Sequence, residues 1–190
     1  MQQLLTGQTR LPGFSGEWEV RYLGDLCKLK SGESITAARI DGHSAYLCYG
    51  GNGLRGYTST FTHDGKYALI GRQDALCGNV VGVEGRFFAS EHALVVTANT
   101  DIAIEWLTYV LSRMNLNQYS ESSAQPGLSA SKLVMLRIDA PSTAAEQTAV
   151  AALLSDLDAE LAALEARLSK TRALKQAMMQ ELLTGRIRLL

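Results

Sequence analysis

The segment PSTAAEQTAVAALLSDLDAELAALEARLSKTRALKQAMMQELLTG, residues 141–185, decides the architecture of this 190-residue chain. From Thr143 to Leu183 it contains no glycine and no proline, and it is rich in Ala, Leu, Glu, Lys, Gln and Arg, which are good helix formers. Pro141 precedes the helical pattern, and Thr184-Gly185 ends it. About 40 helical residues at ~1.5 Å each form a rod of roughly 60 Å, longer than one small domain covers. We therefore predict one long helix, part of whose apolar stripe packs against another helix.

Apolar residues recur along this helix at alternating steps of three and four, the spacing of a coiled-coil seam. Polar residues interrupt the seam at Thr171 and Lys175. We expect the seam to be a dimerisation surface, and its predicted members are Val150, Leu154 (or its neighbour Leu153), Leu157, Leu161, Leu164, Leu168, Met178 and Leu182.

The charges of the helix are segregated along its axis. The first half carries Glu146, Asp156, Asp158, Glu160 and Glu165, whereas the second half carries Arg167, Lys170, Arg172, Lys175, Arg186 and Arg188 with only Glu181 opposing them. Complementarity to the helix macrodipole and solvation explain this pattern without a partner. Antiparallel packing on a second copy also explains it, because acidic and basic halves then face one another, and we favour this interpretation.

The two ends of the chain carry the same short sequence. MQQLLTGQTRL at 1–11 and MQELLTGRIRL at 179–189 are identical at 8 of 11 positions, with an offset of 178 residues. Both copies resemble the last turn of a helix followed by Thr-Gly, where glycine can take the left-handed conformation. We therefore predict three parts: residues 1–13 as the tail of a preceding helix repeat, 14–140 as a folded domain, and 141–190 as the long helix.

Composition limits the possible classes of protein. With 46% hydrophobic and 19% charged residues the chain can bury a core, and a net charge of −1 gives no strongly basic footprint overall. Cys27, Cys48 and Cys77 are widely spaced, so buried free thiols are favoured over a zinc site or disulfides. No apolar run has the length of a signal peptide or membrane span, and we expect a cytoplasmic protein without a membrane partner.

Residues 14–140 combine short strands with one helix. A helix is predicted over 101–114 with Asp101 as its cap, a loop over 119–132, and a closing strand over 133–138. The other predicted strands are 44–49, 56–61, 67–71, 79–83, 87–89 and 93–97. The fold class is therefore α+β: a small mixed domain followed by one long coiled-coil-forming helix.

Catalytic motifs are missing from the sequence. Gly51 to Gly56 matches G-x-G-x-x-G, but the residues after it continue as a strand and do not open the helix that a phosphate cradle needs. There is no E-x-K, no Walker A loop, no G-x-S-x-G and no Asn/Asp-Pro-Pro-Tyr/Phe, and His43, His63 and His92 are isolated. We therefore predict neither a catalytic residue nor a metal ligand.

Local charge differs from the total. Residues 28–72 contain six basic and three acidic side chains, about +3, interleaved with polar groups that can bind phosphates or base edges. A solvated polar face explains this stretch equally well. As a DNA-binding face, its members together with two residues from the 119–132 loop would be Asn52, Arg55, Tyr57, Thr58, Arg72, Gln73, Gln125 and Lys132.

Several segments resemble the DNA-specificity subunits of type I restriction-modification systems. PSTAAEQ at 141–147 resembles the family's P-x-x-x-E-Q helix opening, with one extra residue between Pro and Glu, and KQAMMQELLTG at 175–185 resembles its K-x-x-M-Q-x-L-L-T-G ending. IGRQDALCGNV at 70–80 is similar to I-G-R-x-G-x-x-G-x-V, although Asp74 stands where the family usually has glycine. SEHALVV at 90–96 and GLSASKL at 127–133 resemble the following strand and the loop to the last strand.

This resemblance implies a half-subunit with one target-recognition domain and one conserved helix, or the second half of a complete subunit. It implies that the chain recognises one half of an interrupted double-stranded DNA site alongside methylation and restriction subunits. From the apolar stripe and the charge polarity of the long helix, we expect it to do so as an antiparallel homodimer. S-adenosylmethionine, ATP and Mg would belong to those partners, and this chain would hold no cofactor and catalyse nothing. The alternative class is a helical scaffold or interaction protein without DNA recognition.

Overall fold

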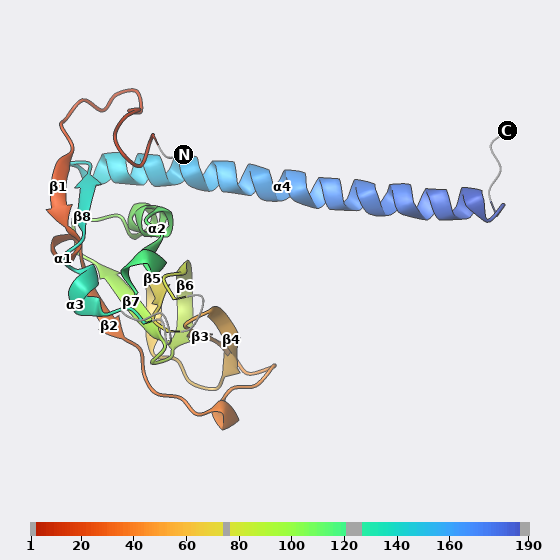
Figure 1. Ribbon diagram of the computed structural model, residues 1–190, viewed down its shortest axis with the longest axis horizontal. Helices are drawn as coiled ribbons and strands as arrows, with labels where there is room; N and C mark the ends of the chain where they lie inside the picture. Colours follow the sequence, from red (N-terminus) through yellow and green to blue (C-terminus); the bar gives the residue numbers. More distant parts are fainter. Residues whose placement is uncertain (1–2, 74–76, 121–126, 187–190) are drawn as a thin grey trace. The chain divides into compact units, whose positions relative to one another are not determined.

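The computed structural model describes residues 3–73, 77–120 and 127–186 (Figure 1). The chain packs as two compact units, Met1–Ala151 and Ala152–Leu190. The first unit contains the strands and the short helices, and the second consists mainly of the long helix α4 (Ala144–Leu183), which begins in the first unit. The α+β class predicted from the sequence is confirmed. The boundaries 1–13, 14–140 and 141–190 stay a prediction about repeat units.

A six-stranded sheet forms the centre of the first unit. Its order is β2 (Cys27–Ser31), β7 (Ala93–Ala98), β5 (His63–Gly71), β6 (Val80–Ala89), β3 (Tyr46–Gly50) and β4 (Gly53–Thr58). Neighbouring strands are antiparallel except for the parallel pair β3 and β6. A core of Leu69, Val83, Phe87, Ala89 and Val95 is buried among the central strands.

Strand β5 is strongly curved. The Ala89 N–H donates to Thr62 Oγ1 just before the strand, and the Arg72 N–H donates to the His92 carbonyl just after it. Both ends of β5 therefore reach one short turn between β6 and β7. Gly65 and Gly85 are register partners with φ of +129° and +87°, conformations that glycine adopts most readily, and they permit this curvature.

Helix α2 (Ile104–Arg113) packs on β5, β6 and β7 through its apolar face. Trp106, Leu107, Val110 and Leu111 are buried there. The predicted cap is wrong, because α2 begins at Ile104 with Ala103 in the N-cap position, and Asp101 pairs with Arg21 at 3.3 Å. The Ala103 N–H at the helix start donates instead to Gln147 Oε1 of α4 at 2.8 Å.

A second sheet consists of two antiparallel strands, β1 (Glu19–Tyr22) and β8 (Arg137–Ala140). Helix α1 (Leu23–Leu26) directly follows β1 in the chain, and α3 (Ala130–Leu133) precedes β8. The strand predicted over 133–138 is wrong in its first half. The Val134 N–H donates to the Ala130 carbonyl and the Leu136 N–H to the Leu133 carbonyl, so this apolar run is first helix and turn. The loop predicted over 119–132 likewise contains α3.

The remaining differences concern the strands. The predicted segments 79–83 and 87–89 are one continuous strand, β6, because Gly85 fits the ladder opposite Gly65. Strand β4 begins at Gly53, three residues before the predicted start, and ends at Thr58. Strands β1 and β2 were not predicted, although the alternation of apolar and charged residues in β2 is the pattern of a half-buried strand.

Helix α4 confirms the predicted long helix and its stop signal. Thr143 Oγ1 accepts a hydrogen bond from the Glu146 N–H at the start. At the end, the Gly185 N–H donates to the Leu182 carbonyl and the Arg186 N–H to the Glu181 carbonyl, with Gly185 at φ +70°. These two bonds are those of the Schellman motif. Gly7, the repeat equivalent of Gly185, has φ +69°.

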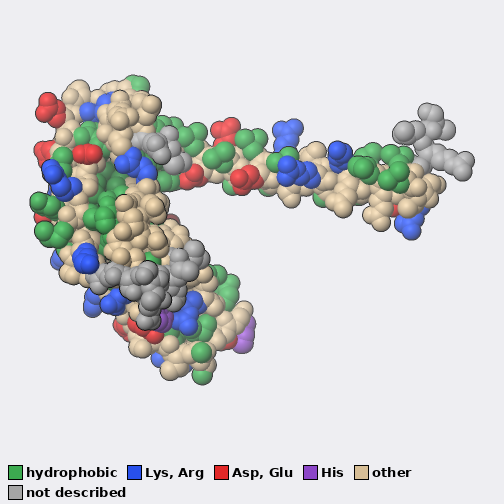
Figure 2. Space-filling view, in the orientation of Figure 1, with side chains coloured by type: hydrophobic (Ala, Val, Ile, Leu, Met, Phe, Trp, Pro, Cys, Tyr) green, Lys and Arg blue, Asp and Glu red, His purple; other side chains and the backbone are tan. Residues whose placement is uncertain are grey.

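The apolar seam of α4 has two parts. Val150 and Leu154 are 2% and 0% exposed, so their side chains are buried within the single chain and do not offer surface to a partner. Leu157, Leu161, Leu164, Leu168 and Met178 are 40–54% exposed. The acidic and then basic side chains along the helix are visible in Figure 2. Apart from Leu153, which is 36% exposed, a second copy could therefore contact the seam only from Leu157 onward.

The structure also bears on the cysteines and on membrane-spanning helices. The three cysteines are free and buried, which confirms the prediction of buried thiols. Burial raises the pKa of Cys27 to about 12. Among the residues that the structure describes, no helix is both long and apolar enough to cross a bilayer.

Candidate nucleic-acid interface

Several turns and strand ends meet at one end of the six-stranded sheet. They are the turn between β3 and β4, the residues after β5, the turn between β6 and β7, and the end of β2. A Cβ atom at Gly51 would lie 3.1 Å from the His92 carbonyl oxygen and 3.2 Å from that of Gln73. Gly51 therefore allows a close approach of the chain's own turns.

Arg55 lies across the glycine turn. A Cβ at Gly50 would collide with Arg55 Cδ and would lie 3.4 Å from Ser90 Oγ. Burial raises the pKa of Cys48 beneath the turn, and the Arg55 charge partly opposes that rise. Arg55 is exposed and makes no ion pair with any residue that the structure describes. Its guanidinium is available for an anionic ligand such as a phosphate.

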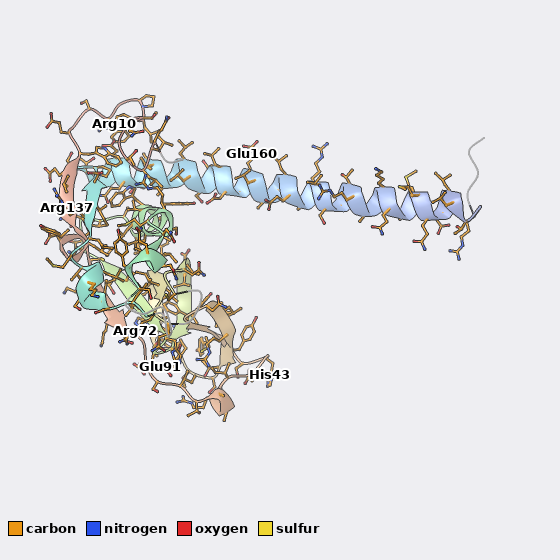
Figure 3. The ribbon with its side chains drawn as sticks, viewed as in Figure 1. Arg10, His43, Arg72, Glu91, Arg137 and Glu160 are labelled. Carbon is orange, nitrogen blue, oxygen red and sulfur yellow. The ribbon has the colours of Figure 1, made fainter. Side chains whose placement is uncertain are left out.

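Arg72 belongs to a hydrogen-bonded chain that links β5, β2 and the turn after β6. Arg72 Nη1 donates to Ser31 Oγ at 3.3 Å, and Ser31 Oγ donates to the Glu91 carbonyl at 3.1 Å. Glu91 Oε2 accepts from the Ile35 N–H at 3.3 Å. Figure 3 shows Arg72 and Glu91 at the same end of the sheet.

Both the side chain and the backbone of Gln73 contact other segments of the chain. His92 Nδ1 lies 2.5 Å from Gln73 Oε1, and His92 Nε2 lies 3.5 Å from Glu91 Oε1. The Gln73 backbone forms a bridge with Gly127, and the Leu128 N–H donates to the Arg72 carbonyl. The segment beginning at Gly127 therefore runs beside Gln73, although the two are far apart in sequence.

The predicted DNA-binding residues lie in different environments, some exposed and some buried. Asn52 is exposed in the glycine turn, and Tyr57 is half-buried with its backbone paired to Asp41. Lys132 is exposed on α3. Thr58 is fully buried, so its hydroxyl does not face solvent as the prediction requires. Gln125 and the unusual Asp74 lie outside the described residues.

One base and one acid of the basic stretch, residues 28–72, are paired with residues outside it. Lys66 pairs with Glu105 of α2 at 2.7 Å, which raises the pKa of Lys66 and lowers that of Glu105. The acid Asp64 is likewise matched by Arg86 at 2.9 Å. Lys28 and Lys30 are exposed on one face of β2 and, like Arg55, form no ion pair within the described part of the chain.

The histidines differ in role. His63 stacks on Phe87 with a ring separation of 5.3 Å, and burial lowers its pKa. His43 is exposed beside Asp41. His92 was not predicted as a site residue, because its contact with Gln73 depends on strand pairing that leaves no local signal. No group of three or more His, Cys, Asp or Glu suited to a metal occurs among the described residues.

Comparisons with known proteins place this chain in a family of DNA-specificity domains. Residues 15–171 match the family model described as the type I restriction modification DNA specificity domain, and the chain belongs to that family. It is 44% identical, over 146 residues, to the type I restriction enzyme EcoprrI specificity subunit of Escherichia coli, covering 75% of this chain and 36% of that protein. A putative type I restriction enzyme specificity subunit of Haemophilus influenzae is 25% identical over 127 residues, which are 65% of this chain and 32% of that protein.

Solved structures share the fold. The type I restriction-modification S subunit from M. genitalium superposes with a TM-score of 0.72 at 21% identity, over 90% of this chain and 47% of that chain. A chain from a study of complex assembly and conformational transition of the type I R-M system gives 0.71 at 18% identity, over 95% and 50%. This chain therefore spans about a third of the curated relatives that it matches and about half of these structural ones.

Proposed function

We propose that this chain is a sequence-specific DNA-binding half-subunit that recognises one half of an interrupted site. This proposal is supported by the cluster of Arg55, Arg72, Gln73 and His92 at one end of the sheet, in a domain of the specificity family. Arginine and glutamine carry the donors and acceptors that bind phosphates and base edges. Lys28 and Lys30, exposed on β2 and without an ion pair among the described residues, add positive charge.

The proposed assembly is an antiparallel homodimer through α4. The exposed leucines from Leu157 to Leu168 supply an apolar stripe, and the charge polarity of the helix matches that of a second, reversed copy. Two recognition domains related by a two-fold axis would read an interrupted inverted repeat, with the helices as the spacer. Dimerisation also brings two copies of the local basic surface to one DNA.

In this proposal the chemistry belongs to partner subunits. Methylation subunits with S-adenosylmethionine and a restriction subunit with ATP and Mg would dock on the dimer, and this chain would select the site without catalysing a reaction. The complex would act on cytoplasmic DNA.

The decisive experiment is to express the chain with a cognate methylation subunit and to map methylated adenines across the genome. We expect methylation confined to one interrupted, two-fold symmetric motif. An Arg55→Ala variant should reduce methylation at that motif, whereas a Lys66→Ala variant should not, since Lys66 is already paired with Glu105. A dimer that shifts no DNA and directs no methylation would instead favour the helical scaffold.

A further inference from the structure

The side chain of Gln73 is oriented by a relay of polar contacts. The Ile35 N–H donates to one Glu91 oxygen at 3.3 Å, the other Glu91 oxygen lies 3.5 Å from His92 Nε2, and His92 Nδ1 lies 2.5 Å from Gln73 Oε1. The relay therefore starts at the backbone and ends at the Gln73 amide. His92 and Glu91 side chains are 37% and 35% exposed, so the relay lies at the surface of the domain.

The backbone on either side of this relay is also held. The Arg72 N–H donates to the His92 carbonyl at 2.9 Å, and the Gln73 backbone bridges to Gly127. Gly51 packs against the carbonyls of both Gln73 and His92. Because the main chain cannot shift freely, the contact with His92 fixes the orientation of the Gln73 side chain.

This contact decides which hydrogen bonds Gln73 can offer. A free glutamine presents one acceptor oxygen and two N–H donors, and with both kinds of group it pairs with the N6 and N7 atoms of adenine. An amide oxygen cannot donate, so the proton between Gln73 Oε1 and His92 Nδ1 belongs to the histidine. Because the contact directs Oε1 toward His92, the Nε2 donors are the part of the Gln73 amide that is turned to a ligand.

We propose that His92 is a positioning residue that presents Gln73 to DNA as a hydrogen-bond donor, which selects a base with acceptors in the major groove. Guanine, with acceptors at both N7 and O6, fits this donor best, and adenine loses the bidentate pairing that a free glutamine would make. This inference rests on the proposed function. It adds which residue controls specificity at one position of the half-site.

The contact between His92 and Gln73 would also form if it served only to stabilise the two turns. The test must therefore separate the choice of base from the stability of the domain and from its overall affinity for DNA. The full chain selects duplexes from a library randomised at the half-site, and the enriched base is read at each position. The variants are His92→Phe, which removes the donor at similar volume, His92→Asn, which retains a side-chain amide donor, Gln73→Ala and Gln73→Glu. His43→Phe is the matched control, since His43 is 88% exposed beside Asp41.

We expect the wild-type chain to select guanine at one position of the half-site. His92→Phe should lower that preference by about tenfold, within the range of a base-specific hydrogen-bonded pair, while affinity for unrelated duplexes and the midpoint of unfolding stay unchanged. His92→Asn should restore part of the preference, and Gln73→Ala should abolish it with no further loss in the double variant. Gln73→Glu should shift the choice toward cytosine, whose N4 donates.

The inference is overturned if His92→Phe selects the same bases as wild type with the same strength, or if it weakens binding to every sequence equally. It is also overturned if the position affected by Gln73→Ala selects adenine in the wild-type chain. A wild-type chain that enriches no sequence at all would overturn the proposed function itself, and that failure is visible before any variant is compared.

Discussion

Arg10 and Glu146, 136 positions apart in the sequence, form a bidentate ion pair, with 2.7 Å from Nε to Oε1 and 2.8 Å from Nη2 to Oε2. Trp18 Nε1 donates to the same carboxylate at 3.2 Å, and the Arg10 guanidinium lies 6.0 Å from the centre of the Trp18 ring. The Glu146 side chain is 3% exposed. These contacts bind the N-terminal repeat to the first turn of α4, and they give a structural role to the glutamate of the E-Q motif.

Replacing Glu146 with glutamine should destabilise the first unit. Glu146→Gln removes the counter-ion of Arg10 from a buried position, and because Arg10 is partly exposed we expect a loss of about 2–3 kcal/mol. Both tryptophans, Trp18 and Trp106, lie in this unit, so urea unfolding followed by tryptophan fluorescence measures the loss directly. Glu160→Gln, on an exposed turn of α4, is the control and should change stability by less than about 0.5 kcal/mol. Equal effects of the two variants would show that the ion pair contributes nothing.

Interrupting the leucine seam should dissociate the proposed dimer. Leu161 is 54% exposed, and Leu161→Glu would place a charge in the apolar interface while leaving the first unit intact. Ala166→Glu introduces the same charge on the opposite face of the helix and should leave the dimer unchanged. Sedimentation velocity at micromolar concentration distinguishes the two species. A wild-type chain that sediments as a monomer would refute the dimer altogether.

Arg55 should contribute to DNA affinity through its charge. Arg55→Ala is expected to weaken binding about tenfold, equivalent to about 1.4 kcal/mol. It should also reduce the dependence of log K on log salt by about one unit, since one phosphate contact is lost. Fluorescence anisotropy over a salt series measures both quantities. Lys66→Ala should change neither, because Lys66 is neutralised by Glu105; a loss in both variants alike would point to a general charge effect.

Asp41 should titrate far below an ordinary aspartate. Hydrogen bonds from the Ser44 hydroxyl at 2.5 Å and from the His43 and Ser44 N–H groups at 2.9 and 2.7 Å lower its pKa from 3.8 to about 2. Since the folded-state pKa is depressed, the stabilisation is complete above pH 3.8 and is lost as the pH falls toward 2. NMR titration of the carboxyl carbon measures the pKa. Ser44→Ala should raise it toward the ordinary value, and an unchanged pKa would exclude the hydroxyl as the main cause.

Local features of the sequence were enough to predict the long helix and its ends. Forty residues without glycine or proline, Thr143 at the start and Gly185 at the end act through neighbours within one or two turns. Strand β7 was predicted for a similar reason, since its apolar residues are continuous. The E-Q motif was visible as a resemblance, but the partners of Glu146 and Gln147 were not.

The composition of the site depended on contacts between distant residues. Thr58 looked like a polar surface residue until strand pairing buried it, and Lys66 looked like a free base until α2 brought Glu105 beside it. His92 reaches Gln73 only because β5 curves so that both of its ends approach one turn. In the long helix, the periodicity of the leucines is a property of the chain, because helical spacing is local. Which leucines remain exposed is a property of packing, because Val150 and Leu154 are buried only once the chain has folded.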